Sequence, residues 1–156
     1  MEYKSYTVEE AKKKLEYYCA YQERSHTEVQ QKLKELNMIH QAADAIIIHL
    51  LDNNYLNEER FARAFARGKH RIKQWGLTRI VNELKARHIS KYNIDAALKE
   101  ITPEEYAATF DELSAKQWEF VKEKNIYKKK KKVMDFLMRK GFESNLIYEK
   151  LNELSK

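Results

Sequence analysis

Apolar residues in the middle of the chain recur with the period of an α-helix. Phe61, Phe65, Gly68 and Ile72 follow one another at intervals of four, three and four residues, which places them on one face of a helix. Asn57, a residue type that favours the N-cap, marks the start of this helix. Four arginines have the same kind of spacing about a quarter-turn away: Arg60, Arg63, Arg67 and Arg71.

The same patterns predict eight further helices. They cover about 7–22, from 25 onward, about 40–52, 77–87, 90–101, 102–124, 127–140 and 144–154. Three capping boxes open helices, at Thr7–Glu10, Ser25–Glu28 and Thr102–Glu105, and Pro103 takes the first helical position of the third box. The Ile46–Ile48 run could form a short strand, but its place inside a longer helical pattern favours a helix.

These helices form three repeats, because apolar positions correspond from one third of the chain to the next. The matched sets are Val29, Ile80 and Val133; Leu33, Leu84 and Leu137; Ala43, Ile94 and Ile147; Ile47, Leu98 and Leu151; and Leu50, Ile101 and Leu154. Asn37, His88 and Gly141 share one position after a helix, and Met38, Ile89 and Phe142 follow them. Because Gly, Asn and His tolerate positive φ, we expect three Schellman-like helix ends.

Composition supports an all-α fold, since 3 Gly and 1 Pro in 156 residues are too few for an all-β protein. We expect three tandem three-helix repeats, over 1–54, 55–101 and 102–156, that share faces in an elongated solenoid-like rod, straight or curved. Thr102 to Leu137 spans 35 positions against 26 from Thr7 to Leu33. We expect this extra length within Trp118–Lys132.

Positive charge is concentrated in the middle repeat. The net charge is +6, and residues 57–101, with 11 basic and 5 acidic side chains, equal that whole excess. Such a region suits an anionic partner, nucleic acid or an acidic protein surface; solvated helix faces are the alternative. The candidate contact residues are Arg63, Arg67, Lys69, Arg71, Lys73, Arg79, Lys85 and Arg87, together with the run Lys128, Lys129, Lys130, Lys131 and Lys132.

Trp75 could stack on a base or a partner's ring, although packing at a helix junction is the simpler role. Trp118 and the group Tyr17, Tyr18 and Tyr21 are expected to serve in core or inter-unit packing. The five lysines would spread around a helix, near an N-terminus where the macrodipole disfavours cations. They are either a solvated helix start or loop, or a contact for phosphate or an acidic surface.

Catalytic and metal-binding patterns are absent from the sequence. It has no HExxH, CxxC, G-x-S-x-G or Gly-rich phosphate loop, and its five histidines lack metal-ligand spacing. We therefore expect a non-enzyme without cofactor or metal. The single cysteine, Cys19, fits a structural thiol in a reducing cytoplasm. No stretch reaches the ~18 apolar residues of a membrane span, and the first residues do not read as a signal peptide.

The central segment resembles the RecX family, whose members regulate the RecA recombinase. The matching residues are Tyr55, Leu56, Glu58, Glu59, Arg60, Phe61, Ala62, Phe65, Lys73, Gly76, Ile80, Leu84 and Ile89, and the stretch 24–36 resembles the family's upstream element. The chain departs from the family at His88, where members usually carry Gly. The resemblance implies the same fold and a monomer that binds RecA or its filament on single-stranded DNA, limiting filament extension, ATPase, strand exchange and coprotease activity.

Two other functions remain open from the sequence. Residues 77–101 read as helix, short turn, helix, as in a DNA-binding helix-turn-helix, but the second helix is poor in base-reading side chains, so DNA binding would be sequence-tolerant. A helical scaffold for another acidic protein is the third reading. For the RecX reading, reversing Arg67, Arg71 and Lys73 to Glu is expected to weaken partner binding without unfolding the protein.

Overall fold

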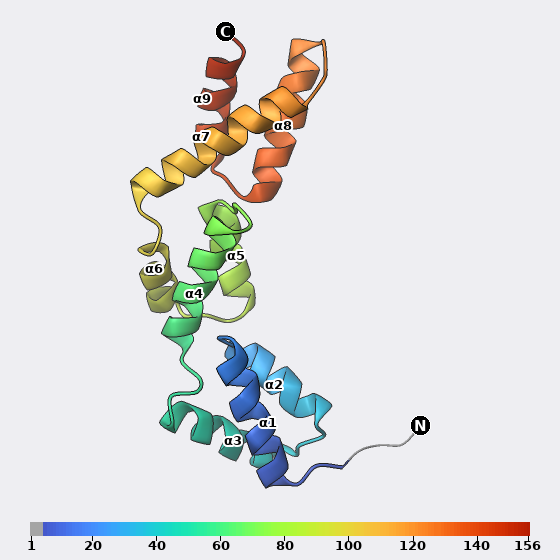
Figure 1. The fold of residues 1–156 in the computed structure, drawn as a ribbon, viewed down its shortest axis with the longest axis vertical. Helices are drawn as coiled ribbons and strands as arrows, with labels where there is room; N and C mark the ends of the chain where they lie inside the picture. Colours follow the sequence, from blue (N-terminus) through green and yellow to red (C-terminus); the bar gives the residue numbers. More distant parts are fainter. Residues whose placement is uncertain (1–4) are drawn as a thin grey trace.

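The structure, a computed structural model, describes residues 5–156. These residues form nine helices and no strand: α1 (Val8–Tyr21), α2 (His26–Glu35), α3 (His40–Asp52), α4 (Glu58–Arg71), α5 (Leu77–Ala86), α6 (Lys91–Leu98), α7 (Pro103–Phe120), α8 (Ile126–Lys140) and α9 (Ser144–Leu154). The three groups α1–α3, α4–α6 and α7–α9 follow one another along an elongated molecule (Figure 1). The all-α fold of three tandem three-helix repeats is confirmed; the predicted repeat boundaries stay predictions, and residues 1–4 of the first repeat lie outside the described part.

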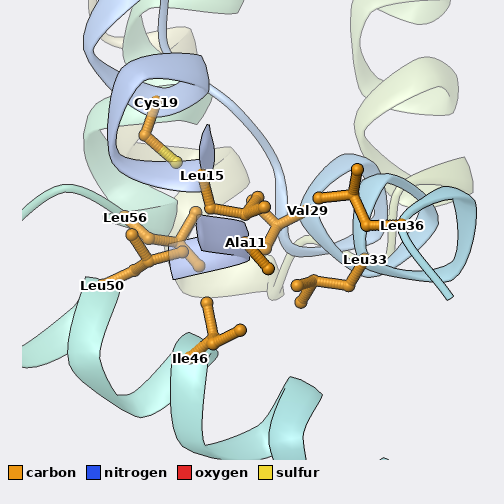
Figure 2. Close-up of a cluster of buried hydrophobic side chains, with 9 residues drawn as sticks. All are labelled: Ala11, Leu15, Cys19, Val29, Leu33, Leu36, Ile46, Leu50 and Leu56. Atoms are coloured by element: carbon orange, nitrogen blue, oxygen red, sulfur yellow. The ribbon is translucent and has the colours of Figure 1, made fainter. Parts of the chain in front are cut away.

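Each group of helices has its own hydrophobic core. Figure 2 shows the first, in which Leu15 of α1, Val29 and Leu33 of α2, and Ile46 and Leu50 of α3 converge. Two further clusters fill the second and third groups. The closest helix pairs all lie within one group, so each unit buries its own apolar faces and meets its neighbours through a smaller seam.

Helix starts follow the predicted caps. The side chains of Thr7, Ser25, Asn57 and Thr102 each accept the backbone N–H three residues ahead. Only the box at Thr7 is reciprocal, with its N–H donating to the Glu10 carboxylate at 3.1 Å. The other two predicted boxes are half right, because Glu28 faces Arg24 and Glu105 binds Arg71.

The three helix ends that the repeats predicted are confirmed. Asn37, His88 and Gly141 have φ of 58°, 60° and 97°. The N–H of the residue that follows each one donates to the carbonyl of Leu33, Leu84 or Leu137, at 3.1, 3.1 and 3.2 Å. His88 therefore adopts the left-handed conformation that glycine adopts most readily.

Two helices end earlier than predicted. α6 stops at Leu98 because the N–H groups of Lys99, Glu100 and Ile101 bond three residues back rather than four, a tighter turn that often finishes a helix. α7 stops at Phe120, where Val121 becomes extended and packs against the third core.

The extra length of the third unit is shared between two helices. α7 has 18 residues against 14 in α1, and α8 begins four residues further from Leu137 than α2 does from Leu33. Because four residues are about one helical turn, the α7–α8 hairpin is one turn longer than its counterpart. The lysine run begins in that added turn.

The predicted apolar stripe of α4 was wrong in part. The buried residues are Phe61, Ala62, Ala66 and His70, whereas Ile72 is 78% exposed. α4 turns its two alanines toward α6 and its buried Ala97, since small side chains let two helices approach closely. The predicted stripe contained the large apolar residues of this helix but neither of the two alanines.

Backbone contact closes the seam between the second and third units. The N–H of Gly76 donates to the Lys140 carbonyl at 2.7 Å, and the N–H of Thr78 donates to the Gly141 carbonyl at 3.0 Å. The free N–H groups at the start of α5 thus meet the free carbonyls at the end of α8, which aligns the two helix dipoles head to tail. Tyr106 adds a bridge, since its hydroxyl accepts the Leu77 N–H and donates to Glu143.

Side chains, rather than backbone, close the equivalent seam between the first and second units. Ser25 and His88 occupy the positions of Gly76 and Gly141. The contact here is from the Thr27 hydroxyl to the Arg87 carbonyl at 3.3 Å. Arg60 adds an ion pair to Glu23, with Nε and Oε1 2.6 Å apart. We infer that this seam separates more easily than the glycine seam.

Replacing Gly76 with Ala should destabilise the glycine seam. A Cβ at this position would collide with the backbone of Gly141, so we expect a loss of about 1–3 kcal/mol in the free energy of unfolding, the usual range for overpacking. Gly68→Ala is the matched control, because a Cβ there meets nothing and alanine should stabilise the helix by about 0.5–1 kcal/mol. Urea unfolding followed by circular dichroism measures both, and equal stability of the two variants would contradict the contact.

Candidate basic interface

The arginines of α4 form ion pairs with glutamates of the same chain. Arg63 contacts Glu59 at 3.1 Å and Glu100 at 3.2 Å, and Arg67 contacts the same Glu100 at 3.1 Å. Arg71 contacts Glu105 at 2.8 Å. Three of the predicted contact residues therefore hold α4 to the end of α6 and the start of α7.

These ion pairs change the expected result of the triple reversal. Glutamate at position 71 would face the carboxylate of Glu105 with no cation between them, and glutamate at position 67 would face Glu100, which would keep only Arg63 as its partner. Like charges at that distance repel, so the expectation of an undisturbed fold does not fit this geometry. A test of partner binding needs cations that make no internal pair.

Cations lie against two aromatic rings, Phe65 of α4 and Trp75 before α5. The Arg79 guanidinium lies 4.0 Å from the centre of the Trp75 ring, and Lys69 Nζ lies 4.9 Å from Trp75 and 5.5 Å from Phe65. The Arg87 guanidinium also lies over Phe65, 4.8 Å from the centre of its ring. We call this series the cation–ring strip. It gives Trp75 the packing role, because side chains of the protein already cover its faces.

An unpaired cationic cluster continues the strip across the glycine seam. Lys140 Nζ donates to the Lys73 carbonyl at 2.9 Å, and Arg79 donates to the Arg139 carbonyl at 3.0 Å. Burial lowers the pKa of Lys140, and the nearby charges of Arg79 and Lys73 lower it further. Across residues 5–156, no salt bridge neutralises any of these four cations. We call Lys73, Arg79, Arg139 and Lys140 the seam cluster.

Arg139 and Lys140 were missed by the sequence argument because they lie in the last turn of α8, far from the middle repeat. Gly76 and Gly141 are the sequence feature that points to Arg139 and Lys140, because a glycine at each of two helix ends allows those ends to come close together. Of the remaining predicted residues, Lys85 is exposed on α5 and Arg87 also pairs with Glu83 at 2.9 Å.

The lysine run occupies the first turns of α8, at the end of the hairpin remote from the seam (Figure 1). The five lysines have different surroundings, as their spread around the helix predicts. Lys129 lies 4.3 Å from the Trp118 ring, Lys131 pairs with Asp135 at 2.9 Å, and Lys132 pairs with Glu123 at 3.1 Å. Lys128 and Lys130 make no ion pair within the described chain.

Of the three tyrosines of α1, Tyr18 packs against the first core as predicted, but the other two do not. Tyr17 and Tyr21 are 74% and 73% exposed, so their assignment to core packing was wrong. Tyr18 is half-buried beneath Arg24, whose guanidinium lies 3.6 Å from the ring centre. Trp118 packs against the third core as predicted.

The described residues hold neither a metal-ligand cluster nor an exposed thiol. No group of three His, Cys, Asp or Glu residues among residues 5–156 could hold a metal ion. Cys19 is buried, and burial raises the pKa of its thiol to about 11, which keeps it protonated and unreactive. No helix over the same residues is long and apolar enough to cross a membrane.

Comparison with known proteins decides the family. Residues 57–98 match the model of the second three-helix domain of RecX, and residues 104–151 match that of its third three-helix domain. The chain belongs to the RecX family. Its family is one of regulatory proteins, and the matched domains correspond to α4–α6 and α7–α9.

Relatives of this RecX-family chain carry the same name. It is 28% identical to a regulatory protein RecX of Prosthecochloris aestuarii, with 88% of each chain covered. It is 26% identical to that of Limosilactobacillus reuteri over 87% of this chain and 51% of the relative. The chain thus spans about half the length of the curated relatives it first matches. The crystal structure of RecX from Lactobacillus salivarius has the same fold, with a TM-score of 0.78, 23% identity, and coverage of 95% of this chain and 96% of that one.

The ion pair of Arg71 with Glu105 makes stability depend on pH in this RecX-family chain. The hydrogen bond from Arg71 lowers the pKa of Glu105 below its ordinary value of 4.5. A lowered carboxyl pKa stabilises the fold above the unfolded value and loses that contribution as pH falls through the folded value. The difference in unfolding free energy between the wild type and Glu105→Gln should therefore be full near neutral pH and shrink below about pH 5.

Urea titrations at several pH values measure this difference. Glu104→Gln is the control, because Glu104 is exposed and makes no ion pair within residues 5–156. A difference for Glu105→Gln that stays constant down to pH 3 would count against the ion pair.

Proposed function

We propose that this chain binds RecA, or the RecA filament on single-stranded DNA, and inhibits filament extension. Slower ATP hydrolysis, strand exchange and stimulated repressor cleavage would follow from a shorter filament. It acts as a monomer in the bacterial cytoplasm, without catalysis of its own. Membership of the RecX family is the observation that carries this proposal.

The charge distribution supports an anionic partner surface. The arginines of α4 are neutralised internally, so the contact surface that we propose uses the unpaired cations of the seam cluster and of parts of the lysine run. Arginine can fork onto phosphate or carboxylate oxygens, and lysine adds point charge. An elongated rod with cations at its seam and at one end suits a repeating anionic surface such as a nucleoprotein filament.

A second candidate is sequence-tolerant DNA binding without RecA. The cations of the cation–ring strip favour it, since a row of positive charges suits a sugar-phosphate backbone. Base-specific reading by α6 is disfavoured: its one amide side chain, Asn93, donates to Glu58, and its exposed positions include Lys91, Tyr92 and Asp95. Any such binding should depend strongly on salt and little on sequence.

The rate of single-stranded-DNA-dependent ATP hydrolysis by RecA tests the proposal, titrated with this chain and with the RecA of the same organism. We expect inhibition well below one molecule per RecA protomer. The double variant Lys73→Glu/Arg139→Glu should require about tenfold more protein for the same inhibition, because charge-assisted contacts of ~1.5–3 kcal/mol would be lost. Both side chains are exposed, so the fold should survive.

The matched control is Lys91→Glu/Lys99→Glu, which makes the same charge change on the exposed surface of α6 and its end. This control should inhibit like the wild type. Equal inhibition by the two double variants would remove the seam cluster from the interface. Inhibition only at concentrations that coat the DNA would favour the second candidate, and no inhibition at any ratio would refute the proposed function.

A further inference from the structure

A basic and aromatic depression lies between α1 and α2, away from the seam cluster. Its volume is about 610 Å³, and its lining residues are Lys13, Lys14, Tyr17, Tyr18, Tyr21, Arg24 and Lys32. Four of the seven are cations, three are tyrosines, and none of the described lining residues is acidic. A smaller hollow on α8 and α9 also pairs tyrosines with lysines, but it has two of each beside Met134 and Leu151.

The two outer tyrosines form an open platform. Tyr17 and Tyr21 are one helical turn apart on α1, their ring centres are 6.4 Å apart, and the ring planes differ by 29°. Both are about three-quarters exposed, and no hydrogen bond within residues 5–156 holds either hydroxyl. Two large rings held side by side in water mark a binding surface rather than a packing surface.

The cations surround this platform on both helices. Arg24 is fixed by its bond to the Tyr18 carbonyl at 2.9 Å, and Lys32 lies 5.6 Å from the Tyr18 ring. Their carboxylate neighbours, Glu28 and Glu35, are each 3.9 Å away, at the outer limit of an ion pair. Lys13 has no ion pair within the described residues. Most of this positive charge is therefore available to a ligand.

We propose that this depression binds a segment of single-stranded nucleic acid, with bases stacked on Tyr17 and Tyr21 and phosphates near Lys13, Lys14 and Lys32. Exposed rings beside a basic groove are the combination by which proteins hold single strands without reading their sequence. An acidic peptide would use the cations but leave the two ring faces without a role. This inference goes beyond the proposed function, since the first unit would contact nucleic acid directly and without RecA.

Binding of a short fluorescein-labelled oligothymidylate to the full chain, without RecA, tests the site by fluorescence anisotropy. Tyr17→Ala/Tyr21→Ala should weaken binding about tenfold or more, given the usual contribution of base–aromatic stacking. Tyr17→Phe/Tyr21→Phe should bind within about twofold of wild type, because the ring faces remain. The control Tyr92→Ala removes an exposed tyrosine of the second unit and should change nothing.

A second probe separates stacking from charge. An abasic oligonucleotide of the same length keeps the phosphates and should bind the wild type about tenfold more weakly than oligothymidylate. Lys13→Ala/Lys14→Ala should reduce the slope of log affinity against log salt by about 1.4, the value for two phosphate contacts to a single strand. Equal binding of abasic, polyglutamate and oligothymidylate probes would show a purely electrostatic surface and overturn the proposal.

Photocrosslinking locates the contact even if other basic surfaces also bind. An oligonucleotide carrying 5-iododeoxyuridine should crosslink to the tryptic peptide of residues 15–24, which holds all three tyrosines. Crosslinks confined to Trp75 or Trp118 would overturn the proposed site. None of these outcomes depends on RecA, so the ATPase experiment can fail while this one succeeds.

Discussion

The approach of two backbones at Gly76 and Gly141 is the constraint on which the joint between the second and third units depends. No side chain larger than hydrogen fits at Gly76, so the first N–H groups of α5 can reach the last carbonyls of α8 directly. The unpaired backbone N–H and carbonyl groups of these two helix ends, which would otherwise need water or capping side chains, bond to each other. Tyr106 and the seam cluster are then held at fixed distances around that contact.

The same architecture without glycines gives a different joint. At the seam of the first and second units, Ser25 and His88 carry side chains where the other seam has none, and the contact passes through the Thr27 hydroxyl. Different residues therefore determine the fold of each unit and the way in which neighbouring units join. Apolar positions build each three-helix core, and two positions at the ends of the second helix of neighbouring units decide how closely they join.

Positive charge is divided between structure and surface. The α4 arginines pair with Glu100 and Glu105 and keep the long helix α7 in place. In the sequence alone these arginines look available to a partner. Within the described chain, unpaired cations remain where the second and third units meet and towards the ends of the rod, and Lys91 and Lys99 remain unpaired on α6 and at its end. The depression on α1 and α2, the seam cluster and the start of α8 therefore offer separate basic surfaces to a long partner.

The sequence by itself determined the helices, their caps and the repeat, because these depend on local spacing and on residue types with strong conformational preferences. The positive φ at Asn37, His88 and Gly141 followed from one shared position. Only the tertiary structure decided which cations are free and which aromatic residues are exposed. Arg67 finds Glu100, 33 positions away, and Tyr17 finds no covering helix. Periodicity reports the faces of a helix, but which neighbour covers a face depends on the packing of distant segments.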